Sequence, residues 1–269
     1  MPTTQPRTLD YWSASRRPLA SLIFLAPLLA AYELGVLWFD AAHIAAVRNG
    51  ADTWMRTWLL QMGGDRPWML PALIVAVLLG WHVCSQSDWR MSPETLVGMF
   101  AESLLGAILL LVMGQVLSLT FQRLGWLPTE MVDAALPSRI ATAVGFLGAG
   151  IYEEVLFRLL MLPAVFGGLR MLLFPRRWAA VGAVLATSLL FSMAHYVEPA
   201  GSGVLPSFAA FAAAANQVID TPAAWFGCGF RILAGLVFAV VFLVRGFGIT
   251  VGCHVLYDLL VGVLILPAE

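Results

Sequence analysis

Six ionisable side chains whose types could act together lie in three mainly apolar segments of the chain. Two adjacent carboxylates and an arginine lie in Gly150–Arg158, whose sequence reads GIYEEVLFR, and histidines follow in two later apolar segments. The six residues are Glu153, Glu154, Arg158, His195, His254 and Asp258. An ionisable group at the centre of a bilayer costs on the order of 3 kcal/mol on insertion scales, so a functional site is the default interpretation.

Helical spacing predicts how some of these side chains pair. Glu154 and Arg158 are one turn apart, so they share a helix face and can form an ion pair. Glu153 is rotated by about 100° from its neighbour and is less directly paired, which suits a general base. His254 and Asp258 have the same four-residue spacing, so that a carboxylate could fix the tautomer of the histidine.

The residue types indicate hydrolysis. A carboxylate and an imidazole can polarise a water molecule for attack on a peptide carbonyl, and a second histidine can help to stabilise the oxyanion. Glu153, His195 and His254 could instead hold zinc with a water in the fourth position. The signatures HExxH and GxSxG are absent from the sequence. An aspartyl dyad needs two membrane aspartates, and only Asp258 qualifies.

The composition is that of a membrane protein. The chain has 269 residues, of which 60% are hydrophobic and 12% are charged, and its mean hydropathy is +0.85. A soluble domain carries about 25% charged residues. The net charge of -1 comes without a charge run, so nothing indicates a nucleic-acid partner. The three cysteines are scattered and include no CxxC pair, so neither a disulfide framework nor a zinc knuckle is indicated.

The elements that must position the six residues are membrane-spanning helices. About 20 apolar residues are needed for each span, and the sequence offers seven such segments. They are roughly Pro18–Phe39, Trp68–Cys84, Val97–Leu119, Ile140–Leu162, Trp178–Tyr196, Trp225–Val244 and Ile249–Leu266. The predicted fold class is therefore an all-α polytopic transmembrane bundle of about seven spans. Leu205–Ala215 is a re-entrant or interfacial segment or an eighth short span.

Details of these segments give further expectations. We expect the fourth span to be broken at Pro163, and a helix to start at Ser92-Pro93-Glu94. Ala41–Gln61 mixes apolar and charged residues and is typical of an interfacial helix. The fourth and fifth spans form an antiparallel hairpin whose tip lies near residue 174. Glu153 and His195 are equally far from this tip, so they are expected at similar depth.

One membrane domain is the simplest organisation. Residues 1–17 form a cytoplasmic segment, residues 18–139 hold the first helices and their connections, and residues 140–269 form the catalytic core. With the N-terminus inside, more arginines fall on the cytoplasmic side than on the other, as the positive-inside rule requires. Among the remaining charges, we expect Glu33 and Glu102 to pair between helices or to line the same polar cavity, and Arg231 to reach the membrane surface.

At the six residues the chain resembles the CPBP family (CAAX protease and bacteriocin-processing, or Abi) of glutamic-type intramembrane proteases. Its motif EExxxR, often with Phe before the Arg, matches Glu153–Arg158 in full. Its motif FxxxH matches Phe191–His195, and its motif HxxxN or HxxxD matches His254–Asp258. The resemblance covers roughly residues 140–266.

The resemblance implies a metal-independent peptidase without a cofactor. Glu153 would act as general base with His195, His254 and the residue at 258 would form the oxyanion hole, and Glu154 and Arg158 would support the site. The commoner residue at the last position is Asn, and an ionised aspartate cannot donate to an oxyanion. Either Asp258 is protonated, or it orients His254.

The implied substrate is a membrane-anchored peptide or protein, cleaved at a C-terminal tail or sorting signal. We expect a multi-pass protein of the cell membrane in contact with the lipid bilayer, in a bacterial inner membrane. Two alternatives stay open: a zinc-dependent membrane protease, and a non-catalytic immunity or scaffold protein whose motif residues hold helices together. A proton-coupled transporter would show inverted repeats, and the sequence has none.

Overall fold

Helices account for most of the residues that the computed structural model describes, which are 11–39, 47–126, 139–197 and 204–265. No strand occurs among these residues, so the all-α prediction is confirmed. In chain order the helices are α1 (Tyr11–Ala14), α2 (Pro18–Trp38), α4 (Gly50–Gln61), α5 (Met69–Cys84), α6 (Pro93–Arg123), α7 (Arg139–Glu154), η1 (Val155–Met161), α8 (Leu162–Met171), α9 (Arg176–Ala194), α10 (Phe208–Asp220), α11 (Pro222–Arg245), α12 (Phe247–Leu259) and η2 (Leu260–Ile265). The segments η1 and η2 are π-helices.

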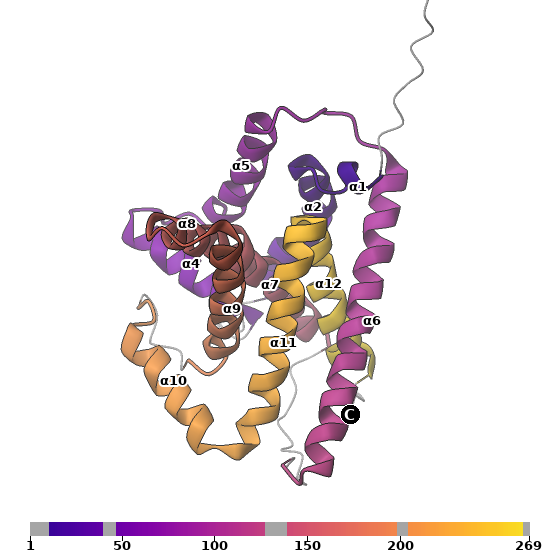
Figure 1. Cartoon of the computed structure of the whole chain (residues 1–269). Coiled ribbons are helices and arrows are strands. Elements are labelled where there is room, and N and C mark those ends of the chain that lie inside the picture. The colour runs from indigo at the N-terminus through magenta and orange to yellow at the C-terminus, as the bar shows by residue number, and fades with distance from the viewer. Residues whose placement is uncertain (1–10, 40–46, 127–138, 198–203, 266–269) are drawn as a thin grey trace, which may run out of the picture.

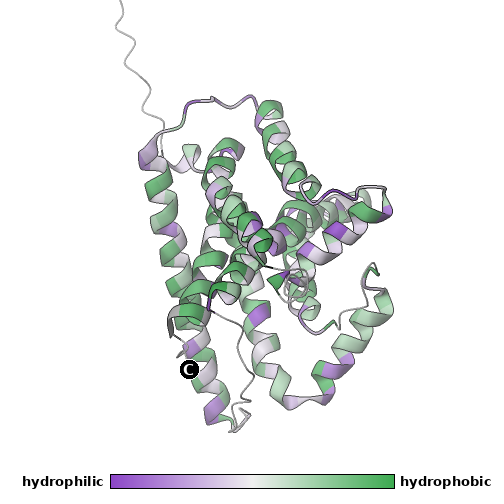
Figure 2. Cartoon of the chain, turned by 180° about the vertical axis from the view of Figure 1, so that it is seen from behind, coloured by the Kyte–Doolittle hydropathy of each residue, from purple (hydrophilic) through white to green (hydrophobic). Residues whose placement is uncertain are grey.

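Seven of these helical stretches correspond to the seven predicted spans. Among the described residues, five are long and apolar enough to cross a membrane: α2, α6, the continuous stretch α7–η1–α8, α9 and α11. Two shorter apolar helices, α5 and the stretch Phe247–Val263, complete the set. Hydrophobic residues cover most of the length of these helices (Figure 2). The prediction of a polytopic membrane bundle is confirmed.

The predicted break in the fourth span is wrong. The chain stays helical from Arg139 to Met171 and passes through Pro163 and the two glycines that follow it. Pro163 lies in the first turn of α8, directly after the π-helix η1. A proline inside a helix removes one backbone hydrogen bond, and the π-helical turn that precedes it accommodates this loss.

Local signals set the other helix ends. Ser92 caps α6 by accepting a hydrogen bond from the backbone N–H of Thr95 at 3.3 Å, so the predicted start is confirmed. Between α11 and α12 a single residue, Gly246, makes the turn with φ = +95°, in the region that favours glycine. Its α-carbon also lies against the backbone of Arg16, where a Cβ atom would come within 3.3 Å.

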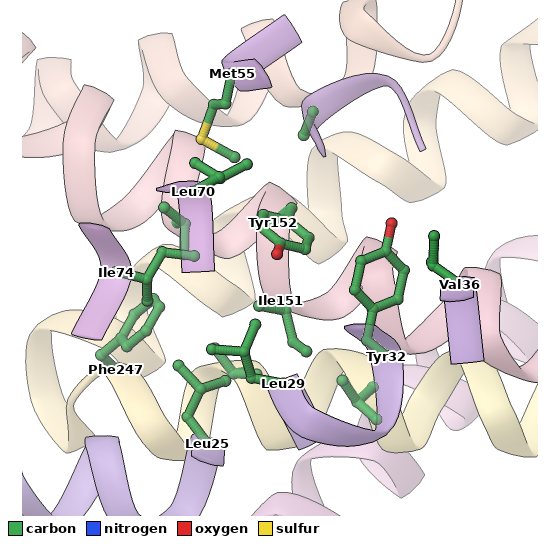
Figure 3. Packing of buried hydrophobic residues seen from close by; sticks show 14 of the residues in the cluster. Leu25, Leu29, Tyr32, Val36, Met55, Leu70, Ile74, Ile151, Tyr152 and Phe247 are labelled. Atoms are coloured by element: carbon green, nitrogen blue, oxygen red, sulfur yellow. The ribbon is translucent and has the colours of Figure 1, made fainter. Parts of the chain in front are cut away.

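Helix α12 is the central element of the bundle. It packs against α2, α6, α7 and α11, and its residues from Phe247 to Val255 are all buried. On one side of it, a hydrophobic cluster joins α2, α4, α5, α7 and α12, as Figure 3 shows for Leu25, Ile74, Ile151 and Phe247. His254 is therefore carried by the most enclosed helix.

Two helices lie in the connections for which the sequence suggested interfacial segments. The predicted segment Ala41–Gln61 contains α4, which begins at Gly50; residues 40–46 lie outside the described residues. The segment predicted at Leu205–Ala215 is the start of α10, a helix of 13 residues, so it is too short to count as an eighth span. The two helices meet where the rings of Trp54 and Phe211 pack edge to face, with centroids 6.3 Å apart.

Candidate active site

Four helical segments bring the six ionisable residues together. Glu153 and Glu154 end α7, and Arg158 follows on the π-helix η1. His195 immediately follows α9, and His254 and Asp258 lie on α12. A π-turn widens the helix locally and is frequent at functional sites.

Glu153 faces both histidines. Its Oε2 atom lies 3.7 Å from Nε2 of His195 and 3.9 Å from Nε2 of His254. The close approach of Glu153 to His195 agrees with their equal distance from the hairpin tip. The Oε2 atom is buried and has no hydrogen-bond partner among the described residues. Both separations are too long for a direct hydrogen bond and suit a bridging water molecule.

The other ring nitrogen of each histidine is held by a hydrogen bond. Nδ1 of His195 lies 2.9 Å from the backbone carbonyl of Phe191. Nδ1 of His254 lies 2.8 Å from Oε1 of Glu154. A carbonyl or an ionised carboxylate only accepts, so each Nδ1 carries the hydrogen and donates it. The Nε2 atoms of both rings are thereby directed towards Glu153.

Glu154 and Arg158 form the predicted ion pair, with 3.1 Å between Oε2 and Nε. Both side chains are almost completely buried, at 0% and 1% exposure. The guanidinium also donates through Nη2 to the carbonyl of Gly235 at 3.1 Å, and its carbon lies 4.5 Å from the ring centre of Phe191. Glu154 thus links a buried arginine to His254.

Aromatic rings enclose the two histidines. Phe191 meets His195 edge to face with centroids 5.1 Å apart, and Phe238 stacks on His254 at 4.5 Å with an interplanar angle of 20°. The sequence analysis missed Phe238. A usable signal was present, because Phe238 and His254 are both eight residues from Gly246, the turn of the α11–α12 hairpin.

Asp258 lies close to Nε2 of His254, the ring nitrogen that also faces Glu153. Its Oδ2 atom is 3.4 Å from Nε2 of His254. Nδ1 of His254 is held by the carboxylate of Glu154, which lies at the end of the neighbouring helix α7. Glu154 therefore holds Nδ1 of His254, whereas Asp258 contacts Nε2 of the same ring and borders the space between His254 and Glu153.

A second polar cluster, which we call the α2–α4–α7 cluster, lies next to the site. It consists of Tyr32, Glu33, Asp52, Arg56 and Tyr152. Arg56 bonds Asp52 at 2.6 Å and Glu33 at 2.8 Å, and Tyr32 donates to Asp52 at 2.8 Å. Tyr152 donates to Glu33, and its ring lies beside that of Tyr32 (Figure 3). Because Tyr152 directly precedes Glu153, the cluster anchors the end of α7 that carries the two carboxylates.

Among the remaining charged residues, the two glutamates lie as expected, whereas Arg231 does not. Glu33 and Glu102 both pair with arginines of other helices, as interhelical pairing predicted; the partner of Glu102 is Arg245, at 2.7 Å. Arg231 was expected at the surface but is half-buried, and it donates to the hydroxyl of Tyr196 at 3.2 Å. Burial raises the pKa of that hydroxyl, which therefore stays protonated and donates to the carbonyl of Ala224.

Metal ligation depends on how closely the candidate ligands converge. The described residues include no group of three His, Cys, Asp or Glu side chains that is placed to hold a metal ion. Glu153, His195 and His254 remain the residues to which zinc would bind in the alternative mechanism. A chelator experiment distinguishes the two mechanisms directly.

Comparison with known protein families gives one match. Residues 135–260 match the family described as type II CAAX prenyl endopeptidase Rce1-like. The matched stretch contains all six site residues. No curated protein and no solved structure matches the chain.

Proposed function

Through residues 135–260 the chain belongs to the Rce1-like family of type II CAAX prenyl endopeptidases, and we propose that it is a glutamic-type intramembrane endopeptidase. The family implies peptidase activity in general, and the apolar helices make the chain a multi-pass membrane protein. The observation that carries the finer proposal is the convergence of two imidazole Nε2 atoms on one buried oxygen of Glu153.

In the proposed reaction a water molecule lies between Glu153 and His195. Its oxygen attacks the peptide carbonyl carbon while Glu153 accepts the proton, and the carbonyl oxygen becomes the oxyanion. The C–N bond then breaks, and the same proton passes to the leaving amine. General acid–base catalysis of this kind contributes about 10²–10⁴ in rate.

The oxyanion is stabilised from the α12 side of the site. Nε2 of His254 and the side chain of Asp258 border the space where the oxyanion forms. Donors that are already oriented in a dry site lower the barrier because they need no reorganisation during the reaction. Glu154 and Phe238 supply this orientation, since they hold the edge and the face of the His254 ring.

The substrate in this proposal is a membrane-anchored peptide or protein that loses a C-terminal tail or a sorting signal. The proposed location is a bacterial inner membrane. Glu153 and His254 are buried and lie on helices α7 and α12 within the bundle, so the substrate's peptide bond must enter from within the membrane or from its edge.

The proposal is tested with purified protein in detergent and a panel of fluorogenic membrane-anchored peptides, with products identified by mass. We expect cleavage of an internal peptide bond, unchanged by a chelator. Loss of cleavage with a chelator, and its return with zinc, would establish the zinc-dependent alternative. If folded protein cleaves no member of the panel, the motif residues serve a scaffold or immunity protein.

A further inference from the structure

A cavity of about 590 Å³ lies between α5, η1, α8, α9 and α11, away from the six site residues, none of which lines it. Its walls are mainly apolar and include Val77, Leu162, Phe166 and Phe242. Two arginines also line it: Arg16, which precedes α2, and Arg176, the first residue of α9. No acidic residue in the described part of the chain lines it. The cavity therefore combines an apolar interior with two positive charges.

Both arginines are available to bind an anion. Each is exposed, and neither forms an ion pair with a described residue. The Arg16 side chain makes one long contact, 3.5 Å from Nη2 to the carbonyl of Leu243, and the structure gives the Arg176 side chain no hydrogen bond within the described residues. By contrast, the neighbouring Arg17 contacts Asp88, with 3.6 Å between Nη2 and Oδ2.

The position of the cavity limits what can occupy it. Helices α2 and α9 begin at this end of the bundle, and α11 ends here at Arg245, followed by Gly246, which also lines the cavity. This is the end that the arginine distribution assigns to the cytoplasm. A ligand here meets apolar helix faces on one side and arginines at the membrane surface on the other.

We propose that this cavity binds one anionic phospholipid. An acyl chain suits the apolar wall formed by Leu162, Phe166 and Phe242, and a headgroup phosphate suits two guanidinium groups. Basic pockets between transmembrane helices on the cytoplasmic side are suited to anionic headgroups, and each arginine near the surface contributes about 1 kcal/mol. A zwitterionic lipid gains less, because its cationic group is repelled by the same arginines.

The bound lipid also supports the neighbouring site. Leu159, in the cavity wall, follows Arg158 on η1, and Phe242 lies one turn after Phe238 on α11. An acyl chain between them fixes the spacing of the two helices that hold Arg158 and Phe238. The lipid site does not depend on the proposed peptidase activity, and its test needs no substrate.

The test measures lipid binding to the full-length protein by native mass spectrometry, with phosphatidylglycerol and phosphatidylcholine of identical chains. Wild type is expected to retain one phosphatidylglycerol in preference to phosphatidylcholine. Arg16→Gln with Arg176→Gln should weaken phosphatidylglycerol binding about 30-fold, which corresponds to two contributions of about 1 kcal/mol. The matched control, Arg90→Gln with Arg177→Gln, removes the same charge at the same end of the bundle from residues that do not line the cavity.

A second variant tests the apolar part without a change in charge. Ala180→Phe fills the cavity from α9 and should reduce binding of both lipids while the protein stays folded, as followed by thermal unfolding. If the double arginine variant fails to fold, Ala180→Phe alone tests whether a lipid occupies the cavity. The proposal is overturned if wild type binds both lipids equally, if the control pair loses as much binding as the cavity pair, or if Ala180→Phe binds like wild type.

Discussion

Oε1 of Glu154 lies 2.8 Å from Nδ1 of His254, although the two residues are 100 positions apart in the sequence. The same carboxylate meets the buried guanidinium of Arg158. Glu154 therefore joins α7, η1 and α12 at the point where the two histidines face Glu153.

Glu154→Gln should lower both stability and activity. The change leaves Arg158 buried without a carboxylate, which costs about 3–5 kcal/mol, and it removes the charged acceptor at Nδ1 of His254. We expect thermal unfolding at a clearly lower temperature and at least about 100-fold slower cleavage. Asp65→Asn is the control, because it breaks a solvent-exposed ion pair with Arg66 and should cost only up to about 1 kcal/mol. Equal effects of the two substitutions would remove the special role given to Glu154.

Asp258→Asn should be tolerated. Since Glu154 already holds Nδ1 of His254, the carboxylate of Asp258 is not needed for that purpose, and an amide can donate to an oxyanion. We expect less than about a tenfold loss in cleavage rate for the amide, and a larger loss for Asp258→Leu, which can donate nothing. If the amide were as inactive as Glu153→Gln, Asp258 would have to act as a carboxylate.

Gly150→Ala should disrupt the site through packing alone. A Cβ atom at this position would come within 2.8 Å of the backbone nitrogen and 3.0 Å of the α-carbon of Val255, the residue after His254. Helices α7 and α12 would have to separate, which costs about 1–3 kcal/mol and moves Glu154 from His254. Gly80→Ala is the control, because its Cβ would meet nothing within 4 Å and should stabilise α5 by up to about 1 kcal/mol. Wild-type cleavage by the Gly150 variant would contradict the close-packing argument.

The α2–α4–α7 cluster should be energetically coupled. Asp52 is fully buried, and 15% of the Arg56 side chain is exposed. Without Asp52, Arg56 keeps Glu33 as a partner; without Arg56, Asp52 keeps only the longer contact to Arg48 at 3.7 Å. Asp52→Asn and Arg56→Gln should therefore each lower the free energy of unfolding by about 1–3 kcal/mol. The double variant should cost less than the sum, with a coupling of about 0.5–3 kcal/mol from a double-mutant cycle. Strict additivity would show that the ion pair contributes nothing.

Local features of the structure follow from the sequence because they depend on spacing within one helix. The four-residue spacing of Glu154 and Arg158 predicts their ion pair, and apolar length predicts the seven helical stretches. The hairpin between α7 and α9 also predicts that Glu153 and His195 meet. Each prediction needs only helical periodicity or one short connection.

Other features depend on the packing of distant helices, which periodicity does not encode. The Glu154–His254 bond and the Arg56 links to Glu33 and Asp52 require α2, α4, α7 and α12 to be placed in three dimensions. The helix continues through Pro163, where a break was expected. The π-helix before it accommodates a residue that usually ends a helix. The position of Arg231 depends on Tyr196, which no spacing rule connects to it.

The account depends most on Glu153 and His195 as the pair that activates water. The most direct test is single-turnover cleavage of a peptide from the panel by wild type, Glu153→Gln and His195→Ala, with Glu94→Gln as a matched control at an exposed glutamate. All four proteins must first show the same thermal unfolding. We predict a rate loss of about 10²–10⁴ for each site variant, and wild-type rates for the control. Wild-type rates for folded Glu153→Gln would contradict the proposed mechanism.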